Sequence, residues 1–449
     1  MPEVLDPCKF PNHTVVASRV HEVLKRATIG DGLDLVVDLQ ASEGSWLIDE
    51  RDGTKYLDMF TFFASSALGM NHPALREDDQ FRVELLTAAF NKPSNSDVYS
   101  VPMAQFVDTF QRVLGDPNLP HLFFIEGGAL AVENALKIAF DWKSRWNESH
   151  GIDPDLGTKV LHLEQAFHGR SGYTLSLTNT GPEKVARFPK FDWPRIPAPV
   201  MSDTADVAAL ERDALDAARR AFVDNPHDIA CFLMEPIQGE GGDNHFRPEF
   251  LRQMHNLAHE FHALFVLDEV QTGCGLTGSA WAYQQLGVQP DVVAFGKKLQ
   301  VCGVMAGGRV DEVPDNVFAV SSRINSTWGG NLTDMVRSRR ILEVIERDDL
   351  IGEAGRLGAH LHSSLVDLAI RHPVISNVRG RGLMRAFTLP DADLRDRVLN
   401  TLFAKERVIL LGSGTSSVRF RPALTVSTAE LDQAVTAVDR VLGEVASAR

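Results

Sequence analysis

Short apolar runs alternate with amphipathic stretches along the middle of the chain, and each apolar run ends in polar or glycine residues. The clearest runs open the segments HLFFIEGG, KVLHLEQAFHG, DIACFLMEPIQGEGG, ALFVLDEVQTGCG and PDVVAFGKK. Apolar runs of this length between helical patterns indicate βαβ units around a mostly parallel sheet. Because ligands bind beyond the carboxyl ends of the strands in such sheets, we expect the polar residues after these runs to converge on one site.

The two ends of the chain show a different pattern. Residues 34–59 alternate polar and apolar positions around a turn at Asp52-Gly53, which predicts a small antiparallel unit. After a long helical pattern that starts at Asn331, the segments GLMRAFTL and SVRFRPAL are typical of strands. We therefore predict an α/β protein with a large domain at 104–330. A smaller α+β domain would combine the N-terminal segment, 1–103, with the linking helix and C-terminal part, 331–449.

The composition is that of a globular protein with an acidic surface. The 449 residues are 44% hydrophobic and carry a formal net charge of -15, which argues against non-specific binding to nucleic acid or to an anionic membrane. The sequence has no apolar stretch long enough to span a bilayer and no signal-peptide pattern at its start. The cysteines are widely spaced, which favours a reducing cytosol; they are Cys8, Cys231, Cys274 and Cys302. We expect a cytoplasmic protein without metal, nucleic-acid or membrane partners.

A glycine pair lies where the run 121–125 meets a helical pattern. Gly127 and Gly128 precede apolar positions that recur at helical spacing. Free backbone N–H groups at a helix start bind anions, and glycine lets a phosphate approach the backbone. The pair is therefore either a phosphate site or a plain strand-to-helix turn. It matches neither GxGxxG nor a Walker loop, which disfavours dinucleotides and ATP.

Two lysines, Lys297 and Lys298, directly follow the apolar run 292–295 and Gly296. A lysine is almost never fully buried unless something compensates for its charge. A partly desolvated lysine has a lowered pKa and forms a Schiff base with a carbonyl compound. The structural alternative for the pair is one salt bridge and one solvated amine, and we favour that alternative for Lys298.

Asp268 and Glu269 follow another apolar run, 264–267. A carboxylate in this place either ligates a metal, acts as a base or pairs with a cation. His259 and His262 miss the HExxH spacing by one residue, and no histidine cluster lies nearby, which disfavours a metal. A phosphate cradle, a carboxylate that keeps a pyridine nitrogen protonated and a reactive lysine are together what pyridoxal phosphate needs.

The segment VLDEVQTGCGLTGSAWAYQQLGVQPDVVAFGKKLQVCG resembles the signature of the class III pyridoxal-phosphate aminotransferases, which have fold type I. In that signature an Asp-Glu pair follows an apolar strand, and a later Asp-led strand ends in a small residue and lysine. The resemblance implies a large domain with a mostly parallel sheet of the seven-stranded type and pyridoxal 5′-phosphate as the cofactor. It implies that Lys297 is the Schiff-base lysine and that Asp268 contacts the pyridine nitrogen.

Further matches follow in order along nearly the whole chain: AFHGRSGYT, EPIQGEGG, NSTWGGN and VRFRPALTVS. They imply that Phe167 stacks on the cofactor ring and that Glu235 and Gln271 lie near it. Thr327 would reach the cofactor phosphate of a partner subunit, which implies a homodimer with shared sites and dimer contacts from the N-terminal segment.

One stretch departs from the family pattern. The usual phosphate loop carries a Ser or Thr, whereas this chain has Glu126-Gly127-Gly128-Ala129. The phosphate would then rely on the backbone N–H groups of Gly128 and Ala129 together with Thr327. Glu126 beside a phosphate is unfavourable unless its carboxylate points away.

Within the family, MFTFFASSALGMNHPAL, FNKPSNSDVYS and STWGGNLTDM resemble the L-lysine 6-aminotransferases. This resemblance implies ping-pong transfer of the ε-amino group of L-lysine to 2-oxoglutarate. The products would be L-glutamate and 2-aminoadipate 6-semialdehyde, which cyclises to piperideine-6-carboxylate. An ornithine or 4-aminobutyrate aminotransferase shares the catalytic residues and stays an alternative, as does an aminomutase of the same fold, which would make no glutamate.

The two substrates place their charges differently. The reacting carbon of 2-oxoglutarate lies next to a carboxylate, whereas the ε-carbon of lysine does not. The resemblance assigns Arg419 to the near carboxylate and Arg170 to the far one, because guanidinium binds carboxylate bidentately. We expect Glu240 to pair with Arg419 while lysine is bound and to swing away for 2-oxoglutarate. Asn325 would hydrogen-bond the α-amino or α-carboxylate group of lysine. The alternative for Glu240 and Arg419 is an ordinary surface ion pair.

Overall fold

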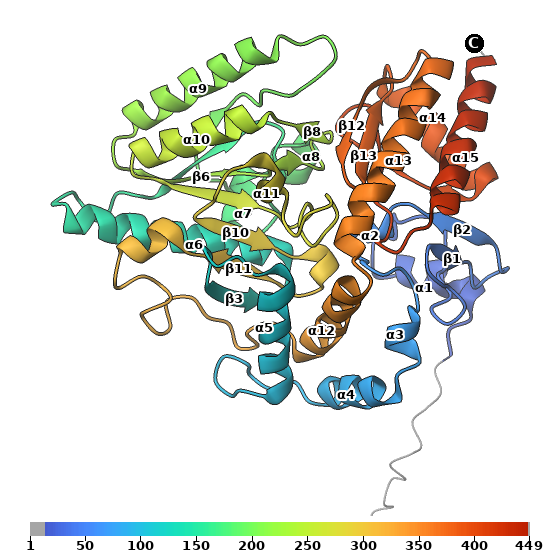
Figure 1. The fold of residues 1–449 in the computed structure, drawn as a ribbon, viewed down its shortest axis with the longest axis horizontal. Coiled ribbons are helices and arrows are strands. Elements are labelled where there is room, and N and C mark those ends of the chain that lie inside the picture. The colour runs from blue at the N-terminus through green and yellow to red at the C-terminus, as the bar shows by residue number, and fades with distance from the viewer. Residues whose placement is uncertain (1–13, 448–449) are drawn as a thin grey trace, which may run out of the picture.

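The computed structural model describes residues 14–447, and its largest element is a seven-stranded sheet in the order β3-β11-β10-β9-β6-β4-β5 (Figure 1). All its neighbouring strands pair in parallel except β11, which is antiparallel to both β10 and β3. The bounds are β3 His121–Ile125, β4 Lys159–Leu163, β5 Arg195–Ile196, β6 Ile229–Met234, β9 Leu264–Asp268, β10 Val292–Phe295 and β11 Cys302–Ala306. The apolar runs of the sequence thus form this sheet, which confirms the predicted α/β class.

Different helices cover the two faces of this sheet. Successive residues of a strand point to opposite faces, so neighbouring residues of one strand pack against different helices. On β10, Val292 and Ala294 pack in the cluster that contains α6, whereas Val293 and Phe295 pack in the cluster that contains the helices of the other face. Both faces are therefore buried, which explains the continuous apolar runs. The helices are α6 Gly128–Ser149 on one face, and α5 Val101–Leu114, α9 Val207–Asp224, α10 Pro248–Glu260 and α11 Ala282–Leu286 on the other.

The smaller part of the molecule brings both ends of the chain together. Figure 1 shows the first strands, in blue, beside the C-terminal elements, in orange and red. A three-stranded sheet has the order β1-β2-β14, and a four-stranded antiparallel sheet has the order β12-β13-β16-β15. The bounds are β1 Trp46–Ile48, β2 Lys55–Asp58, β12 Ser376–Arg381, β13 Met384–Thr388, β14 Val408–Ile409, β15 Leu411–Ser413 and β16 Ser417–Phe420, with α13 Leu350–Arg371, α14 Ala392–Thr401 and α15 Thr428–Ser447.

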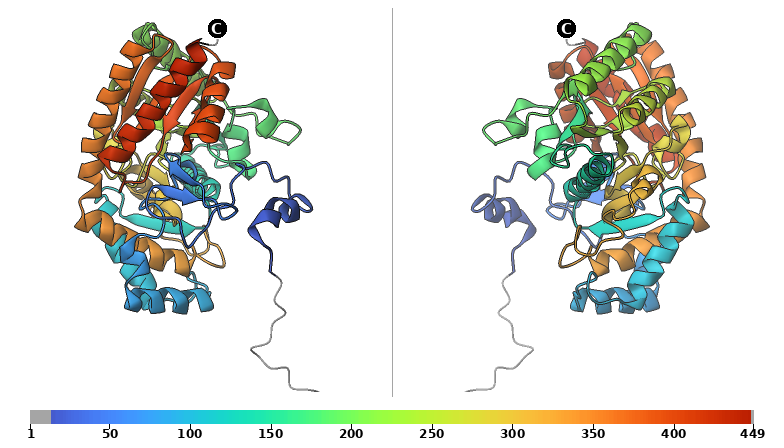
Figure 2. Two further views of the ribbon diagram at one scale, coloured as in Figure 1. Left: turned by 90° about the vertical axis from the view of Figure 1, so that its right-hand side faces the viewer. Right: turned by 90° about the vertical axis from the view of Figure 1, so that its left-hand side faces the viewer.

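The remaining elements link or flank these sheets. The predicted long helix is α12, Leu332–Arg347, and it packs against α5 and α4. Figure 2 shows α1, Val20–Lys25, projecting from the body of the molecule. The others are α2 Thr61–Ala64, α3 Pro73–Arg76, α4 Asp79–Phe90, α7 Gly172–Leu177, α8 Pro182–Val185, β7 Ile237–Gln238 and β8 Asn244–His245.

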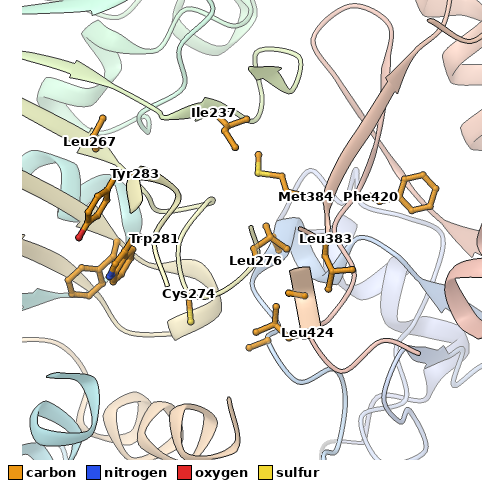
Figure 3. Packing of buried hydrophobic residues seen from close by; sticks show 14 of the residues in the cluster. Ile237, Leu267, Cys274, Leu276, Trp281, Tyr283, Leu383, Met384, Phe420 and Leu424 are labelled. Carbon is orange, nitrogen blue, oxygen red and sulfur yellow. The ribbon is translucent and has the colours of Figure 1, made fainter. Parts of the chain in front are cut away.

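The two parts share one apolar core. Figure 3 shows Leu276, which follows β9, beside Leu383 and Leu424 of the C-terminal part. The backbone N–H of Leu383 donates to the carbonyl of Leu276 at 2.9 Å, which joins the two parts through the main chain as well. This contact fixes the C-terminal part next to the carboxyl ends of the large sheet. Among residues 14–447, no helix is both long enough and apolar enough to cross a membrane.

Candidate active site

The residues singled out in the sequence converge at the carboxyl ends of the large sheet. Asp268 is the last residue of β9, and the register places it opposite Ala294 of β10, just before Lys297. A cavity of about 540 Å³ opens at this edge. Of the residues predicted for the site, those that line this cavity are Gly128, Ala129, Phe167, Arg170, Glu235, Glu240, Asp268, Gln271 and Lys297.

Lys297 presents a reactive amine to the cavity. Burial, together with the positive charges of Arg419 and Arg421, lowers its pKa from 10.5 to about 8, against the opposing effect of Asp268. Its Nζ donates to the carbonyl oxygen of Phe63 at 3.2 Å. A lysine with a pKa near 8 is partly neutral at physiological pH, which is the state that attacks a carbonyl carbon.

Lys298 is buried, contrary to the expectation from the sequence. We favoured a solvated or salt-bridged amine, but its residue is 1% exposed and its Nζ donates to the carbonyl of Ala64 at 3.0 Å. No carboxylate pairs with it among residues 14–447, and burial holds its pKa well below the ordinary value. The reason is the register of the 3₁₀ turn after β10, which directs one lysine into the cavity and the next into the protein interior.

Both lysines support an unusual turn at α2. Thr61, Phe62, Phe63 and Ala64 all have positive φ, between 42° and 68°. Such conformations are uncommon for residues other than glycine, and each costs on the order of 1–3 kcal/mol unless its surroundings impose it. The buried carboxylate of Asp58 accepts the N–H groups of Phe60 and Thr61 at 2.8 Å each. With the two lysines at its carbonyl groups, this turn places the Phe63 side chain at the cavity.

Asp268 is held by a histidine that our sequence interpretation did not assign to the site. Nδ1 of His168 lies 2.8 Å from Oδ2 of Asp268, and both side chains are almost completely buried. The other carboxylate oxygen accepts the backbone N–H of Val270 at 3.1 Å. These contacts fix the orientation of the carboxylate at the floor of the cavity. The signal was in the sequence, since His168 directly follows Phe167 in the motif AFHGR.

The glycine pair opens α6 without a capping side chain. Gly127 has φ 103°, a conformation that L side chains rarely adopt, and no side chain bonds to the first N–H groups of the helix. These N–H groups are therefore free to bind an anion. Glu126 points toward Lys92 and Asn331, each 3.2 Å from its Oε1, so its charge is paired away from the helix start.

Glu235 and Phe167 are tied to each other. The backbone N–H of Phe167 donates to Oε1 of Glu235 at 3.0 Å, and that of Gly239 donates to Oε2 at 2.9 Å. Burial raises the pKa of Glu235 to about 7. Arg170 lies across the Phe167 ring, with its Cζ 5.8 Å from the ring centroid. The ring is thus fixed from the backbone side and faces the cavity.

Glu240 joins the cavity to the C-terminal part. Its Oε2 accepts from Nη2 of Arg419 at 2.9 Å, and its Oε1 accepts from Nζ of Lys184 at 2.8 Å. Burial alone would raise the pKa of Glu240, but the charges of Arg419 and Lys184 outweigh it, and the net shift is downward. The side chain of Arg419 is only 2% exposed, so the pair is not the ordinary surface ion pair that the sequence left open.

A buried network of polar side chains anchors the loop at residues 239–243, which carries Glu240. Asp243 forms a short ion pair with Arg421, and Ser413 donates to its Oδ2 at 2.9 Å. Arg421 also donates to Oε1 of Gln271 at 3.2 Å, so this amide oxygen is already engaged within the protein. Three segments that are distant in sequence thus meet next to Glu240, whose own side chain is 31% exposed.

Asn325 and Thr327 do not join the other residues. Both are exposed in the loop before α12, and neither lines the cavity. Oδ1 of Asn325 accepts the neighbouring N–H of Ser326 at 2.8 Å. The structure therefore brings together the other predicted residues but leaves these two apart.

The arrangement fits pyridoxal phosphate. The free helix start suits its phosphate, Asp268 suits its pyridine nitrogen, and Lys297 suits its aldehyde. A Cβ added at Gly128 would lie 2.8 Å from Cγ1 of Val270, so the space beside the helix start leaves no room for a larger residue. In the part of the chain that the structure describes, no group of three or more His, Cys, Asp or Glu side chains could hold a metal ion.

Two further contacts at the site had no signal in the sequence. The carbonyl group of Phe63 meets Lys297 only because four consecutive residues adopt left-handed backbone conformations, which the sequence TFFA does not favour. Lys184 lies on the short helix α8, outside every motif that we singled out.

The chain is similar to known proteins over nearly its whole length. The family profile described as aminotransferase class-III matches residues 30–442. An L-lysine-epsilon aminotransferase of Mycobacterium tuberculosis is 65% identical over 446 residues, which cover 98% of this chain and 99% of that protein. Mouse mitochondrial 4-aminobutyrate aminotransferase is 31% identical over 447 residues, covering 91% and 86%. The solved structure of the M. tuberculosis lysine aminotransferase in the internal aldimine form has a TM-score of 0.95 and 66% identity, covering 96% of this chain and 100% of that one.

Proposed function

Because the chain belongs to the class III aminotransferases, which use pyridoxal phosphate, we propose that it transfers the ε-amino group of L-lysine to 2-oxoglutarate. The products are L-glutamate and 2-aminoadipate 6-semialdehyde, which cyclises. One observation carries this proposal: Glu240 covers a buried arginine, Arg419, at a distance of 2.9 Å. The site must accept the ε-carbon of lysine, which has no neighbouring carboxylate, and the reacting carbon of 2-oxoglutarate, which has one. The charge of Arg419 must therefore be neutralised for lysine and available for 2-oxoglutarate. The difference between 65% and 31% identity to the lysine and 4-aminobutyrate enzymes also supports lysine over the alternative donor.

The cavity residues would hold the cofactor by its three functional parts. The N–H groups of Gly128 and Ala129 would bind the phosphate, Phe167 would stack on the ring, and Asp268 would pair with the pyridine nitrogen. When bound, pyridoxal phosphate supplies a carbonyl carbon for the amine and a ring that withdraws electrons from the breaking C–H bond. Glu235 and Gln271 lie at the same cavity and complete its polar lining.

Lys297 moves the proton in this proposal. Its amine, with a pKa of about 8, takes a proton from the ε-carbon of lysine and later returns one. A base of this pKa exchanges protons at physiological pH without holding them too tightly. The second half-reaction uses the same amine in the opposite direction, with 2-oxoglutarate as the acceptor.

The charged residues select the two substrates. Arg170 would bind the far carboxylate in both half-reactions, since it lies at the cavity beside Phe167. Arg419 would bind the near carboxylate of 2-oxoglutarate once Glu240 has moved. With lysine bound, the Glu240–Arg419 pair would stay closed, because no carboxylate arrives to compete for the guanidinium.

We also propose a homodimer in which Thr327 reaches the phosphate of the partner's cofactor and Asn325 reaches the partner's substrate. Two observations support it. Both residues are exposed and lie away from their own cavity. Large apolar side chains are also exposed along α4, in the segment after it and at the start of α5; they are Val83, Leu86, Phe90, Val98, Tyr99 and Val101. Exposed apolar surface of this kind marks a protein interface.

We propose a cytoplasmic location, because Cys231, Cys274 and Cys302 are free thiols. Cys8 lies outside the described residues. The division into 1–103, 104–330 and 331–449 stays our proposal for the functional parts of the chain, with dimer contacts from the first.

A panel of amine donors tests the proposed function. Purified protein, pyridoxal phosphate and 2-oxoglutarate are mixed with lysine, ornithine or 4-aminobutyrate, and glutamate is followed over time. We expect glutamate from lysine far above the other donors, together with the six-membered cyclic imine. Glutamate mainly from ornithine or 4-aminobutyrate would contradict the substrate, and no glutamate from any donor would contradict the reaction.

A further inference from the structure

Glu240 has two cationic partners, one on each carboxylate oxygen. Arg419 comes from β16 and contacts Oε2, whereas Lys184 comes from α8 and contacts Oε1 at 2.8 Å. A single carboxylate thus bridges two segments that are distant in the chain. The proposed exchange of partners involves only Oε2 of Glu240, which contacts Arg419. The contact between Oε1 and Lys184 is not needed for that exchange.

The amine of Lys184 is fixed independently of Glu240. Its Nζ also donates to Oγ1 of Thr180, four residues earlier in the chain, at 3.1 Å. It lies 5.8 Å from the centroid of the Phe167 ring, and the Lys184 side chain is 17% exposed. A cation held by three neighbours keeps its place when one of them moves.

The Glu240 side chain is the part of this arrangement that is able to move. Glycines flank it on both sides, and the loop is anchored at each end. At one end the N–H of Gly239 donates to Glu235, and at the other end Asp243 pairs with Arg421. A rotation of the Glu240 side chain between staggered conformations therefore breaks the Arg419 contact without moving the loop.

We propose that Lys184 retains the carboxylate of Glu240 when Glu240 leaves Arg419, and so makes room for a dicarboxylate acceptor at low cost. The proposal rests on the proposed function and adds a positioning residue to it. Without Lys184, the displaced carboxylate would stand unpaired beside the incoming carboxylate of 2-oxoglutarate, and like charges at such a distance repel. With Lys184, one ion pair of Glu240 is kept throughout.

The test compares Lys184→Met with Lys190→Met in the holoenzyme. Lys190 is a matched control, because its Nζ donates only to backbone carbonyls, among them that of Val185 at 2.9 Å. The two half-reactions are measured separately, with lysine alone and with 2-oxoglutarate alone. For Lys184→Met we expect the apparent affinity for 2-oxoglutarate to fall about fivefold, the upper end of the scale of one partly exposed ion pair. Its kcat/KM for lysine stays within about twofold, and Lys190→Met changes neither half-reaction.

A second measurement separates this role from direct substrate binding. Calorimetry follows the binding of glutarate, a dicarboxylate that does not react, to the wild type, Lys184→Met, Glu240→Gln and the double variant. We expect Lys184→Met to weaken glutarate binding only when Glu240 is present. The same loss in the Glu240→Gln background would overturn the proposal, because Lys184 would then contact the ligand itself. An equal loss in both half-reactions would also overturn it, since it indicates a merely structural lysine. A wild type that makes no glutamate from lysine contradicts the proposed function instead, and the glutarate comparison still decides the role of Lys184.

Discussion

Oε2 of Glu240 lies 2.9 Å from Nη2 of Arg419, and this guanidinium is almost completely buried at the edge of the cavity. A buried guanidinium without a carboxylate is unfavourable, so the pair is stable until another carboxylate replaces Glu240. The carboxylate that pairs with Arg419 is therefore exchangeable.

Replacement of Glu240 by alanine should change the balance between the two half-reactions. With Arg419 left unpaired, the site favours ligands that bring their own carboxylate. We expect kcat/KM for lysine to fall about tenfold or more, while binding of 2-oxoglutarate is kept or improved. Separate half-reaction kinetics measure this. Glu183→Ala is the control, because Glu183 is exposed on the same short helix as Lys184 and makes no contact with Arg419. A parallel loss in both half-reactions would contradict the role of Glu240.

The neighbouring lysines should behave differently when each is replaced. Lys297→Ala removes the amine that faces the cavity, and we expect turnover to fall by at least about 10²- to 10⁴-fold, with loss of the visible absorbance of the bound cofactor. Lys298→Met keeps the buried volume but removes one support of the turn at Ala64, so the absorbance should remain and the loss of activity should be far smaller than for Lys297→Ala. Absorbance spectra and steady-state rates of both variants test the assignment. The reverse pattern would make Lys298 the reactive lysine.

The low pKa of Lys297 predicts a pH dependence for cofactor capture. Only the neutral amine attacks the aldehyde, and the neutral fraction grows as the pH rises through the pKa. With a pKa of about 8, the rate at which apoenzyme takes up pyridoxal phosphate should rise between pH 7 and 9 and then level off. Stopped-flow absorbance measures the rate. A rise that continues past pH 10, as for an ordinary lysine, would show that the amine is not desolvated.

His168 should act through Asp268. Removing its imidazole leaves Oδ2 of Asp268 without the contact at 2.8 Å, and the carboxylate is then free to turn from the cavity. A hydrogen bond to a charged group contributes about 1.5–3 kcal/mol, so we expect kcat of His168→Gln to fall about ten- to a hundredfold. Retention of the cofactor during dialysis should weaken as well.

A control for His168 comes from the same sheet. His162 on β4 is equally buried, and neither of its ring nitrogens has a hydrogen-bond partner. His162→Gln should therefore leave cofactor retention unchanged. If both variants lose the cofactor to the same extent, the effect belongs to the stability of the sheet rather than to Asp268.

Much of this site followed from the chain itself. Asp268, Glu235 and Lys297 each stand directly after an apolar run, and parallel strands bring their carboxyl ends to one edge. Local patterns also predicted α12 and the pair β1 and β2. Periodicity and turn residues are local properties, so they suffice for elements of this kind.

Contacts between residues that are distant in the sequence were harder to predict. Lys298 was expected in solvent or in a salt bridge, but its carbonyl partner on Ala64 comes from the left-handed turn near the N-terminus. Nothing in TFFA favours positive φ, since the turn is imposed by Asp58 and by the lysines themselves. Lys184 was missed for the same reason, because its contact with Glu240 depends on the tertiary arrangement and on no motif.

The fate of the two nitrogens of lysine shows which of its amino groups the enzyme transfers. Wild-type protein is given 2-oxoglutarate and either lysine labelled with ¹⁵N at the ε-position or lysine labelled at the α-position, and the glutamate formed is analysed by mass spectrometry. We expect ¹⁵N in glutamate from the ε-labelled lysine and none from the α-labelled lysine. Label from the α-position would contradict it, because the carbon that reacts would then carry a carboxylate and Glu240 would have no reason to cover Arg419.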